Sequence, residues 1–343
     1  TSFRNVTGVQ TCALPISVPA APAEPDVAAL ARAGDLAAVR DLGKGRALVN
    51  KPGPNGDYPL HAAAVRAEPE MAALLLEQGA DLESRDAAGK TPLRRALEAG
   101  TLKTAELLAS RGADLFAADS AGATPLDDAL AKGPEPLAAI VQASNVDRRG
   151  QDGRTALHAA ADRLLLPAVT YLLTLSPDLS IRDNAGRTAL DCALLHPSRK
   201  ESAQIARLLV LRGAVPGFGD FEWFILAARS GDWARPRFSE GDTVLHRAVR
   251  NNLKGFAEYF LDEKVPVDLK NAAGATSLHE AVRAGRYDIA ELLLARGANP
   301  NARDGFGNTA LHIALPESGR RDGVELLIRY KADPSLKDRS GNT

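Results

Sequence analysis

The sequence predicts an all-α solenoid of stacked helix-turn-helix units with projecting β-turn loops, and two observations support this prediction. A tetrad of the Thr-Pro-Leu-His type recurs at spacings of 33, 33, 31 and 33 residues and, after a gap, of 33 and 33 residues. A fixed period of this length is the signature of a repeat architecture. The chain also holds 62 alanines but only 5% aromatic residues, which suits closely packed helices. The tetrads begin at Tyr58, Thr91, Thr124, Thr155, Thr188, Thr243, Thr276 and Thr309.

Each tetrad is predicted to open a short first helix. Its threonine suits the N-cap, where the hydroxyl accepts a hydrogen bond from a backbone N–H of the first turn and contributes ~1 kcal/mol. A proline at the next position, such as Pro92, suits the first helical residue because no donor is needed there. A glycine such as Gly100, Gly133 or Gly285 then allows the tight turn into a second, antiparallel helix.

The second helix of each unit carries apolar residues at helical spacing, as Ile289, Leu292 and Leu293 illustrate. Several second helices are followed by an Arg-Gly pair such as Arg296-Gly297, where glycine can adopt the left-handed C-cap conformation. The loop that follows, for example residues 85–90, contains a glycine able to take positive φ and leads to the next tetrad.

With this tetrad, this period and the Leu-Leu-Leu-x-x-Gly-Ala end of the second helix, the chain resembles ankyrin-repeat proteins over about residues 24–343. The resemblance implies a right-handed stack of helix-turn-helix units that curves into an extended concave face. It also implies that the tetrad histidines make local hydrogen bonds between adjacent loops. Partner proteins would contact the loop tips and the concave side of the first helices.

Three segments depart from the repeat pattern. Residues 26–42 lack the tetrad but keep the helix pair, so we expect an N-terminal repeat or cap there. The unit that begins at Thr124 is two residues short. Between Gly213 and Thr243 we expect a degenerate unit, with a first helix at residues 221–229 and a second helix cut short at Pro236. We expect the superhelix to kink or loosen at this unit.

The chain is therefore divided into five parts. Residues 1–17 share nothing with the repeats and are interpreted as a non-native or adaptor-derived segment, followed by a linker at 18–25. Residues 26–217 form the N-terminal ankyrin stack with its cap, 218–242 a degenerate aromatic-rich repeat, and 243–343 the C-terminal ankyrin stack. The final Gly341-Asn342-Thr343 opens another repeat, so we expect both ends to be truncated.

Composition restricts the classes of partner and compartment. Lys and Arg number 42 and Asp and Glu 43, a balance that argues against a nucleic-acid partner. No run approaches the ~18 apolar residues of a membrane helix, so we expect no membrane insertion. Only Cys12 and Cys192 occur, which excludes a disulfide framework and a Cys-rich zinc module. This slightly favours the cytoplasm and leaves a periplasmic or secreted location open.

No catalytic, cofactor or metal site is predicted. Five of the six histidines share the fourth tetrad position and should therefore lie roughly 10 Å apart along the stack, too far apart to share one metal ion. Cys192 is expected to be a buried small hydrophobe, because no basic residue is adjacent to activate it. Nothing supplies a nucleophile, a base and an orienting group together, so we predict that the protein is not an enzyme.

Six of the sixteen aromatic residues gather in 21 residues, 218–238, of the degenerate repeat. Two interpretations are open. The cluster is either a small core that fills the irregular junction, which we favour, or a hot spot for a partner, since tryptophan dominates many interfaces. The cluster consists of Phe218, Phe221, Trp223, Phe224, Trp233 and Phe238.

The family's contact positions are the residue before each tetrad and those seven and eight after its first residue. Carried onto this chain, fifteen such positions include eight basic and five acidic residues. Our hypothesis is an acidic partner surface across Lys90–Arg187, and the alternative is a solvated surface of mixed charge. The candidate partner-binding residues are Lys90, Glu98, Lys132, Arg154, Arg163, Arg187, Arg250, Arg283 and Trp233.

The predicted function is that of a monomeric protein–protein interaction scaffold, which binds a partner protein of unknown identity through its concave face and loop tips. The alternative is the targeting or regulatory ankyrin region of a larger enzyme whose catalytic domain is missing from this fragment. A purely structural spacer is disfavoured, because the loop and first-helix positions vary in charge rather than repeating.

Overall fold

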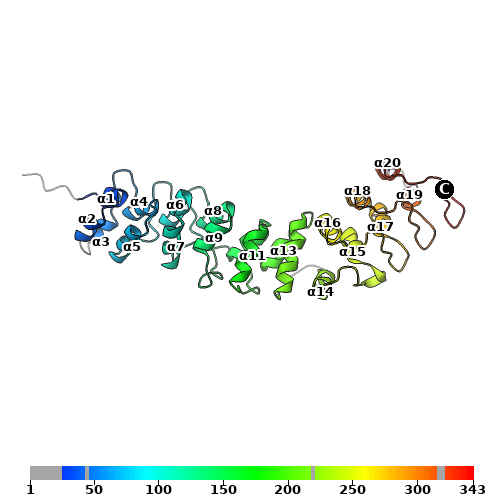
Figure 1. The fold of residues 1–343 in the computed structure, drawn as a ribbon, viewed down its shortest axis with the longest axis horizontal. Coiled ribbons are helices and arrows are strands. Elements are labelled where there is room, and N and C mark those ends of the chain that lie inside the picture. The colour runs from blue at the N-terminus through cyan, green and yellow to red at the C-terminus, as the bar shows by residue number, and fades with distance from the viewer. Residues whose placement is uncertain (1–24, 43–45, 218–220, 315–320) are drawn as a thin grey trace, which may run out of the picture.

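The computed structural model describes residues 25–42, 46–217, 221–314 and 321–343, and its helices follow one another in one elongated array (Figure 1). In these residues the regular structure is helical, apart from one isolated β-bridge between Lys270 and Thr276. The predicted all-α solenoid is confirmed. Residues 1–17, most of the linker and Phe218 lie outside the described residues. No helix in the described ranges has both the length and the hydropathy needed to cross a membrane.

The helices form two rows, and neighbours pack within each row, as α10 packs on α12 and α16 on α18. The first helices are α4 (Pro59–Ala64), α6 (Pro92–Ala99), α8 (Pro125–Lys132), α10 (Ala156–Asp162), α12 (Ala189–Leu194), α15 (Val244–Arg250), α17 (Ser277–Arg283) and α19 (Ala310–Ala314). The second helices are α5 (Glu70–Glu77), α7 (Leu102–Ser110), α9 (Pro134–Ile140), α11 (Leu166–Thr174), α13 (Lys200–Leu211), α16 (Lys254–Asp262), α18 (Tyr287–Ala295) and α20 (Arg321–Arg329).

The N-terminal segment forms the helix pair that was predicted. Helix α1 (Val27–Ala33) packs on α4, helix α2 (Leu36–Asp41) packs on α5, and a short α3 (Arg46–Val49) follows. Asp26 caps α1 by accepting a hydrogen bond from the Ala29 N–H at 3.0 Å, and Asp35 caps α2 in the same way at 2.9 Å. The pair is therefore an additional repeat without a tetrad.

The predicted caps and turns form at most repeats. At four tetrads the threonine hydroxyl accepts from the backbone N–H three residues on, at Thr91, Thr124, Thr188 and Thr243. Gly100 and Gly285 turn the chain between the two helices with φ of 74° and 66°. Leu164 makes the same turn with φ of 56°, which costs an L-residue free energy that glycine avoids.

The core runs between the two rows for the length of the array. Leucines of the second helices, such as Leu108, Leu172 and Leu293, are fully buried, and so are alanines of the first helices, such as Ala96 and Ala160. These small side chains let the helices approach closely, in agreement with the alanine-rich composition.

The junction between the two stacks differs from the prediction. Helix α14 (Glu222–Ser230) forms at the expected place, but the expected second helix is absent: residues 231–238 are bends and loop, followed by the 3₁₀ turn η1 (Ser239–Gly241). The Asp232 carboxylate accepts from the N–H groups of Ala234 and Arg235, and Pro236 offers no N–H, so no helix propagates. The prediction of a shortened second helix at this unit was therefore wrong.

Because that helix is absent, α13 and α16 pack directly on each other. The N–H of Gly255, in the first turn of α16, donates to the carbonyl oxygen of Pro197 at 3.1 Å. A Cβ at Gly255 would lie 2.2 Å from the carbonyl carbon of Arg199, so the two backbones can meet only at a glycine.

Aromatic rings fill the volume that a second helix occupies elsewhere. Trp223, Phe224 and Trp233 are 4%, 1% and 5% exposed. The ring centroids of Phe224 and Phe256 lie 5.1 Å apart, as do those of Trp233 and Phe260. The line of helices descends to α14 and rises beyond it (Figure 1), yet the junction is packed densely rather than loosely.

Candidate functional site

The first helices and the loops that precede them form one surface, called here the first-helix face. The tetrad histidines hold these loops in register, as the resemblance implied. In each case Nε2 lies 2.8–3.1 Å from a backbone carbonyl oxygen in the next loop. The pairs are His61 with Lys90, His158 with Arg187, His246 with Ala275, His279 with Asn308 and His312 with Asn342.

The hydrogen bond at the other ring nitrogen, Nδ1, fixes which nitrogen carries the proton of the neutral ring. Nδ1 of His158 lies 3.3 Å from the Thr155 N–H and so accepts from it, as Nδ1 of His279 accepts from the Thr276 N–H at 3.1 Å. The proton of the neutral ring is therefore on Nε2, which donates to the loop carbonyl. Burial lowers the pKa of His61, His158, His246 and His279, which keeps these rings neutral.

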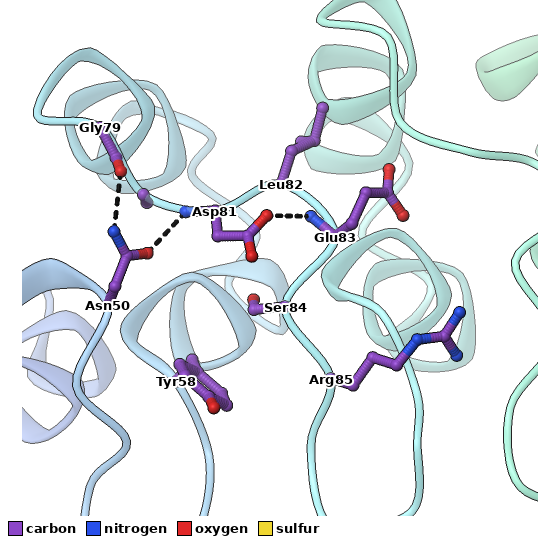
Figure 2. A pocket seen from close by; sticks show the side chains of 9 residues that line it. Asn50, Tyr58, Gly79, Asp81, Leu82, Glu83, Ser84 and Arg85 are labelled. Atoms are coloured by element: carbon purple, nitrogen blue, oxygen red, sulfur yellow. Dashed lines mark hydrogen bonds between the residues drawn. The ribbon is translucent and has the colours of Figure 1, made fainter.

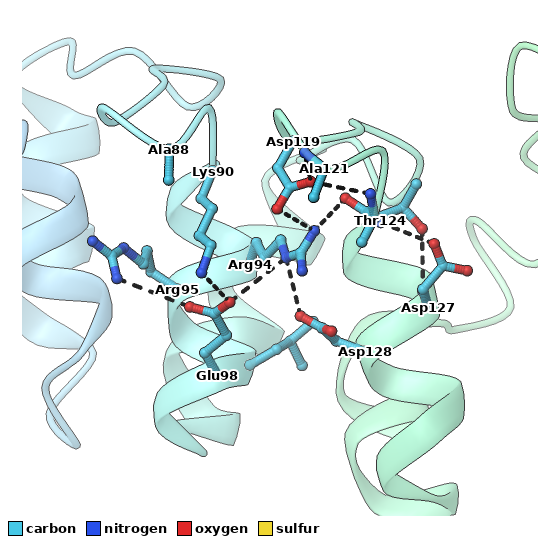
Figure 3. Close-up of polar contacts among 12 residues, drawn as sticks. Ala88, Lys90, Arg94, Arg95, Glu98, Asp119, Ala121, Thr124, Asp127 and Asp128 are labelled. Atoms are coloured by element: carbon cyan, nitrogen blue, oxygen red, sulfur yellow. Dashed lines mark hydrogen bonds and ion pairs between the residues drawn. The ribbon is translucent and has the colours of Figure 1, made fainter.

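Arg94 takes the place of the histidine in its repeat (Figure 3). Its Nη1 donates to the carbonyl oxygen of Ala123, 29 residues on, which is the separation that His158 spans to Arg187. The guanidinium also pairs with Asp119 at 2.9 Å and with Asp128 at 3.1 Å. Arg94 was not among the predicted site residues, although its place in the tetrad was legible in the sequence.

Aspartates at the same tetrad position act differently. Asp127 and Asp191 each accept from the N–H of the tetrad threonine and close a capping box. Asp191 also accepts from the Gly217 N–H at 2.8 Å, and this bond fastens the segment that leads into the junction. Asp127 instead pairs with Arg163 of the next repeat.

Aspartate or asparagine opens most of the projecting loops. In the loop after α5, Asp86 Oδ1 accepts from the N–H groups of Ala88 and Lys90, both at 2.9 Å. Asp183 does the same, and although burial raises its pKa, hydrogen bonds from Arg187 and from the loop backbone lower it to about 2. The loops are thus fixed by side chains before any partner arrives. Equivalent bonds start the loops at Asp119, Asn271, Asp304 and Asp338.

The predicted charged residues lie on the first-helix face, and the structure pairs most of them with carboxylates. Lys90 contacts Glu98 at 2.6 Å, and Glu98 also lies 3.9 Å from Arg95 (Figure 3). Lys132 donates to the carbonyl oxygen of Leu97, at the end of the neighbouring first helix. Of the nine candidates, only Lys90 and Glu98 form a side-chain pair with each other within the described residues.

The remaining predicted arginines have partners that the sequence reading did not assign. Arg154 pairs with Asp162 at 2.9 Å and Arg187 with Asp183 at 2.7 Å. Arg163 pairs with Asp127 of the preceding repeat. Arg250 contacts Glu240 at 2.7 Å, and Arg283 contacts Glu280 at 2.6 Å. The basic excess expected from the candidate positions is therefore compensated locally by carboxylates, and the face carries both signs of charge.

Trp233 lies apart from these charges, inside the aromatic cluster. It is 5% exposed and packs on Phe224, Tyr259 and Phe260. The guanidinium carbon of Arg207 lies 5.5 Å from its ring centroid, a cation–π contact from the second-helix side. This burial supports the core interpretation of the cluster over the hot-spot interpretation.

A hollow of about 660 Å³ opens between the first repeats, lined by Asn50, Tyr58 and residues 79–85 (Figure 2). Its polar groups bind one another. Asn50 donates to the Gly79 carbonyl at 2.9 Å and accepts from the Asp81 N–H at 2.7 Å. Glu83 makes the equivalent bond to the Asp114 N–H at 2.7 Å. These side chains join successive repeats by hydrogen bonds.

The comparison with known families agrees with this geometry. A family model described as ankyrin repeats in three copies matches residues 27–119, 126–220 and 214–304. A second model, described as ankyrin repeats in many copies, matches residues 294–343. Among curated proteins, none matches the chain.

Proposed function

We propose, from the premise that the chain belongs to the ankyrin-repeat family, that it is a non-catalytic scaffold that binds a partner protein through its first-helix face and loop tips. Ankyrin repeats generally mediate protein–protein interaction. The observation that carries the proposal is the attachment of most loops to their neighbours by a histidine or arginine hydrogen bond. A surface fixed in this way loses little conformational entropy when a partner binds.

Within the part of the chain that the structure describes, the thiol and the tetrad imidazoles support the non-catalytic part of the proposal. Cys192 is fully buried, and burial raises the pKa of its thiol to about 11, which disfavours the nucleophilic thiolate. The buried tetrad histidines spend both ring nitrogens on structural hydrogen bonds at most repeats, as His158 does.

The test begins with affinity capture on the full chain and measures the Kd of each purified candidate partner. Neutral substitutions are preferable to charge reversals, because Arg163→Glu would place two carboxylates in contact with each other. We expect Arg154→Gln with Arg163→Gln to weaken binding roughly tenfold. Lys103→Gln, at an exposed position of α7 on the second-helix side, is the control and should leave Kd unchanged. Equal Kd values for both variants would contradict the proposed face.

A further inference from the structure

The projecting loops carry a basic side chain at one repeated position, six residues before the first residue of the next tetrad. Counted back from the eight tetrads and from Thr343, nine such positions occur. Two hold Pro52 and Ala118, and the other seven hold lysine or arginine, all of them exposed. Stacking turns a position that is basic in most repeats and acidic in none into a row of like charges. The seven are Arg85, Arg149, Arg182, Arg237, Lys270, Arg303 and Lys337.

This row lies on the side of the loops that faces away from the first helices. The residue after each basic position is often a buried aspartate on the first-helix side, as the contact of Asp86 with Arg95 at 2.7 Å shows. Lys270 forms the β-bridge to Thr276, so the backbone is extended at this position. Because successive side chains of extended backbone project to opposite sides, the basic side chains project outward.

The basic side chains of the row bind neutral carbonyl groups instead of carboxylates. Arg149 Nη2 donates to the Arg182 carbonyl oxygen at 2.6 Å, and Lys270 Nζ donates to the Arg303 carbonyl oxygen at 2.8 Å. Each acceptor lies 33 residues on, at the same position of the next loop, so these side chains run along the edge from loop to loop. Within the described residues, none of the seven forms an ion pair. Their charge is therefore available, unlike that of the arginines on the first-helix face.

The row is continuous over the C-terminal stack, where four successive loops carry it. Backbone hydrogen bonds of 2.9, 2.8 and 3.4 Å join each loop to the next, from the N–H groups of Ala272, Gly305 and Arg339 to the carbonyl oxygens of Glu240, Ala273 and Phe306. The loops are thus held side by side before a partner binds. We call this part of the row the basic loop edge, and its members are Arg237, Lys270, Arg303 and Lys337.

Few carboxylates accompany the basic loop edge. The side chains two positions before and after its members share their side of the loops, and they add Arg235, Arg339 and one carboxylate, Asp268. Asp268 accepts from a backbone N–H of the next loop. Asp333 and Asp338 accept from backbone N–H groups of their own loop. Six basic groups thus stand against three carboxylates, in a chain whose overall net charge is −1.

We infer that the basic loop edge binds an extended acidic segment of the partner protein, with Asp or Glu at about every third residue. Packed repeats are roughly 10 Å apart, and an extended chain advances ~3.3 Å per residue, so three residues of the segment span one repeat. The balanced charge of the whole chain favours such a segment over a nucleic acid. The inference rests on the proposed scaffold function and adds a second contact, outside the first-helix face, that orients the partner.

The test measures the Kd of two fluorescein-labelled acidic peptides on the full chain by fluorescence anisotropy. One peptide has glutamate at every third position of a serine-rich sequence, and the other has the same composition with its glutamates contiguous. We expect the spaced peptide to bind more tightly, with an affinity that falls as salt is added. Lys270→Gln with Arg303→Gln and Lys337→Gln should raise its Kd about tenfold.

The matched control removes the same charge from exposed positions on and after the second helices. Lys103→Gln with Arg111→Gln and Lys264→Gln should leave the Kd of the spaced peptide unchanged. Arg303→Gln alone guards against a folding defect, because its side chain forms no hydrogen bond or ion pair within the described residues. This single variant should raise Kd about twofold, with an unchanged thermal midpoint.

Equal Kd values for the two triple variants, or equal affinity of the spaced and the contiguous peptide, would overturn the inference. Phosphatidylserine vesicles that bind through the basic loop edge when the spaced peptide does not would assign the edge to a membrane surface, and would also overturn it. The scaffold proposal is decided separately, by the effect of Arg154→Gln with Arg163→Gln on the captured partner, so either proposal can fail without the other.

Discussion

The guanidinium group of Arg94 donates a hydrogen bond to the carbonyl oxygen of Ala123 and so makes the loop contact that a histidine makes in five other repeats. Histidine and arginine both place a donor at this position, whereas Asp127 and Asp191 at the same position close capping boxes instead. Arginine also brings a charge to the contact, and its guanidinium group forms ion pairs with Asp119 and Asp128. Arginine at this position therefore forms ion pairs that a neutral histidine cannot form.

Arg94→Ala should lower the free energy of unfolding by about 1–3 kcal/mol, the usual loss when a buried hydrogen-bonding group is left without its partner. Arg94→His should lower it less, since the imidazole can restore the bond to the Ala123 carbonyl but not the ion pairs. Urea unfolding of both variants measures the difference. Equal losses would mean that the carbonyl bond contributes nothing.

The buried histidines predict a loss of stability on mild acidification. The unfolded chain takes up protons on imidazoles near pH 6.5, whereas burial lowers the pKa of His61, His158, His246 and His279 in the folded chain. The unfolded state therefore binds more protons below pH 6.5, and the free energy of unfolding falls as pH decreases from about 6.5 to 5. Burial raises the pKa of Glu83, so this group acts in the opposite sense, but it is one group against the four histidines.

Unfolding midpoints in urea at pH 7.5, 6.5 and 5.5 check this dependence. His246→Gln removes one of the four groups and should flatten the slope between pH 6.5 and 5.5, whatever it does to stability at pH 7.5. A free energy of unfolding that stays constant over this range would contradict the prediction.

Ser176 and Gly297 occupy the same place after their second helices, both with positive φ, of 56° and 90°. An L-residue pays about 1 kcal/mol or more for this conformation. Ser176→Gly should therefore raise the free energy of unfolding by about 1 kcal/mol, and Gly297→Ser should lower it by a similar amount. No heavy atom lies within 4 Å of the position that a Cβ would take at Gly297, so backbone strain is isolated there. In thermal unfolding, Ser176→Gly should have a higher Tm than the unaltered chain, and Gly297→Ser a lower one.

The parts of the fold that the sequence predicted are those with a local cause. The caps at Thr91 and Thr188 and the turn at Gly100 follow from residues within one helical turn. The partners of the charged residues have no local cause: Arg163 meets Asp127 from 36 residues away, and only the stacking of repeats brings them together. The charged candidate residues could be assigned to the first helices and their loops, but their partners could not be predicted.

The position of the junction could be predicted from the sequence, but its structure could not. Its aromatic composition marked the site of the irregularity, yet whether Trp233 replaces a helix or follows one depends on the direct approach of α13 to α16. Phe306 is the opposite case, since its place at a loop tip is readable from the alignment of loops. Only the structure shows that the Phe306 side chain is 70% exposed.

Trp233→Ala should lower the free energy of unfolding by about 3–5 kcal/mol, because the ring is buried against Phe224 and Phe260 and its removal leaves a cavity there. Leu226→Ala is the matched control on α14: its side chain is 60% exposed, and its loss should change stability by less than about 0.5 kcal/mol. Unchanged stability of Trp233→Ala together with lost partner binding would instead support the hot-spot interpretation.

The direct packing of α13 on α16 predicts that the two stacks unfold together. Leu293→Ala, in the core of α18, should lower the free energy of unfolding by about 2–5 kcal/mol. In a coupled array this loss reaches the far side of the junction, so amide hydrogen exchange should show reduced protection in α13 as well as in α18. Gly255→Ala forces the backbones at Gly255 and Arg199 apart, and in that background the effect of Leu293→Ala should stay within the residues after Thr243. Unchanged protection of α13 in Leu293→Ala alone would show that the aromatic junction packs tightly without coupling the stacks.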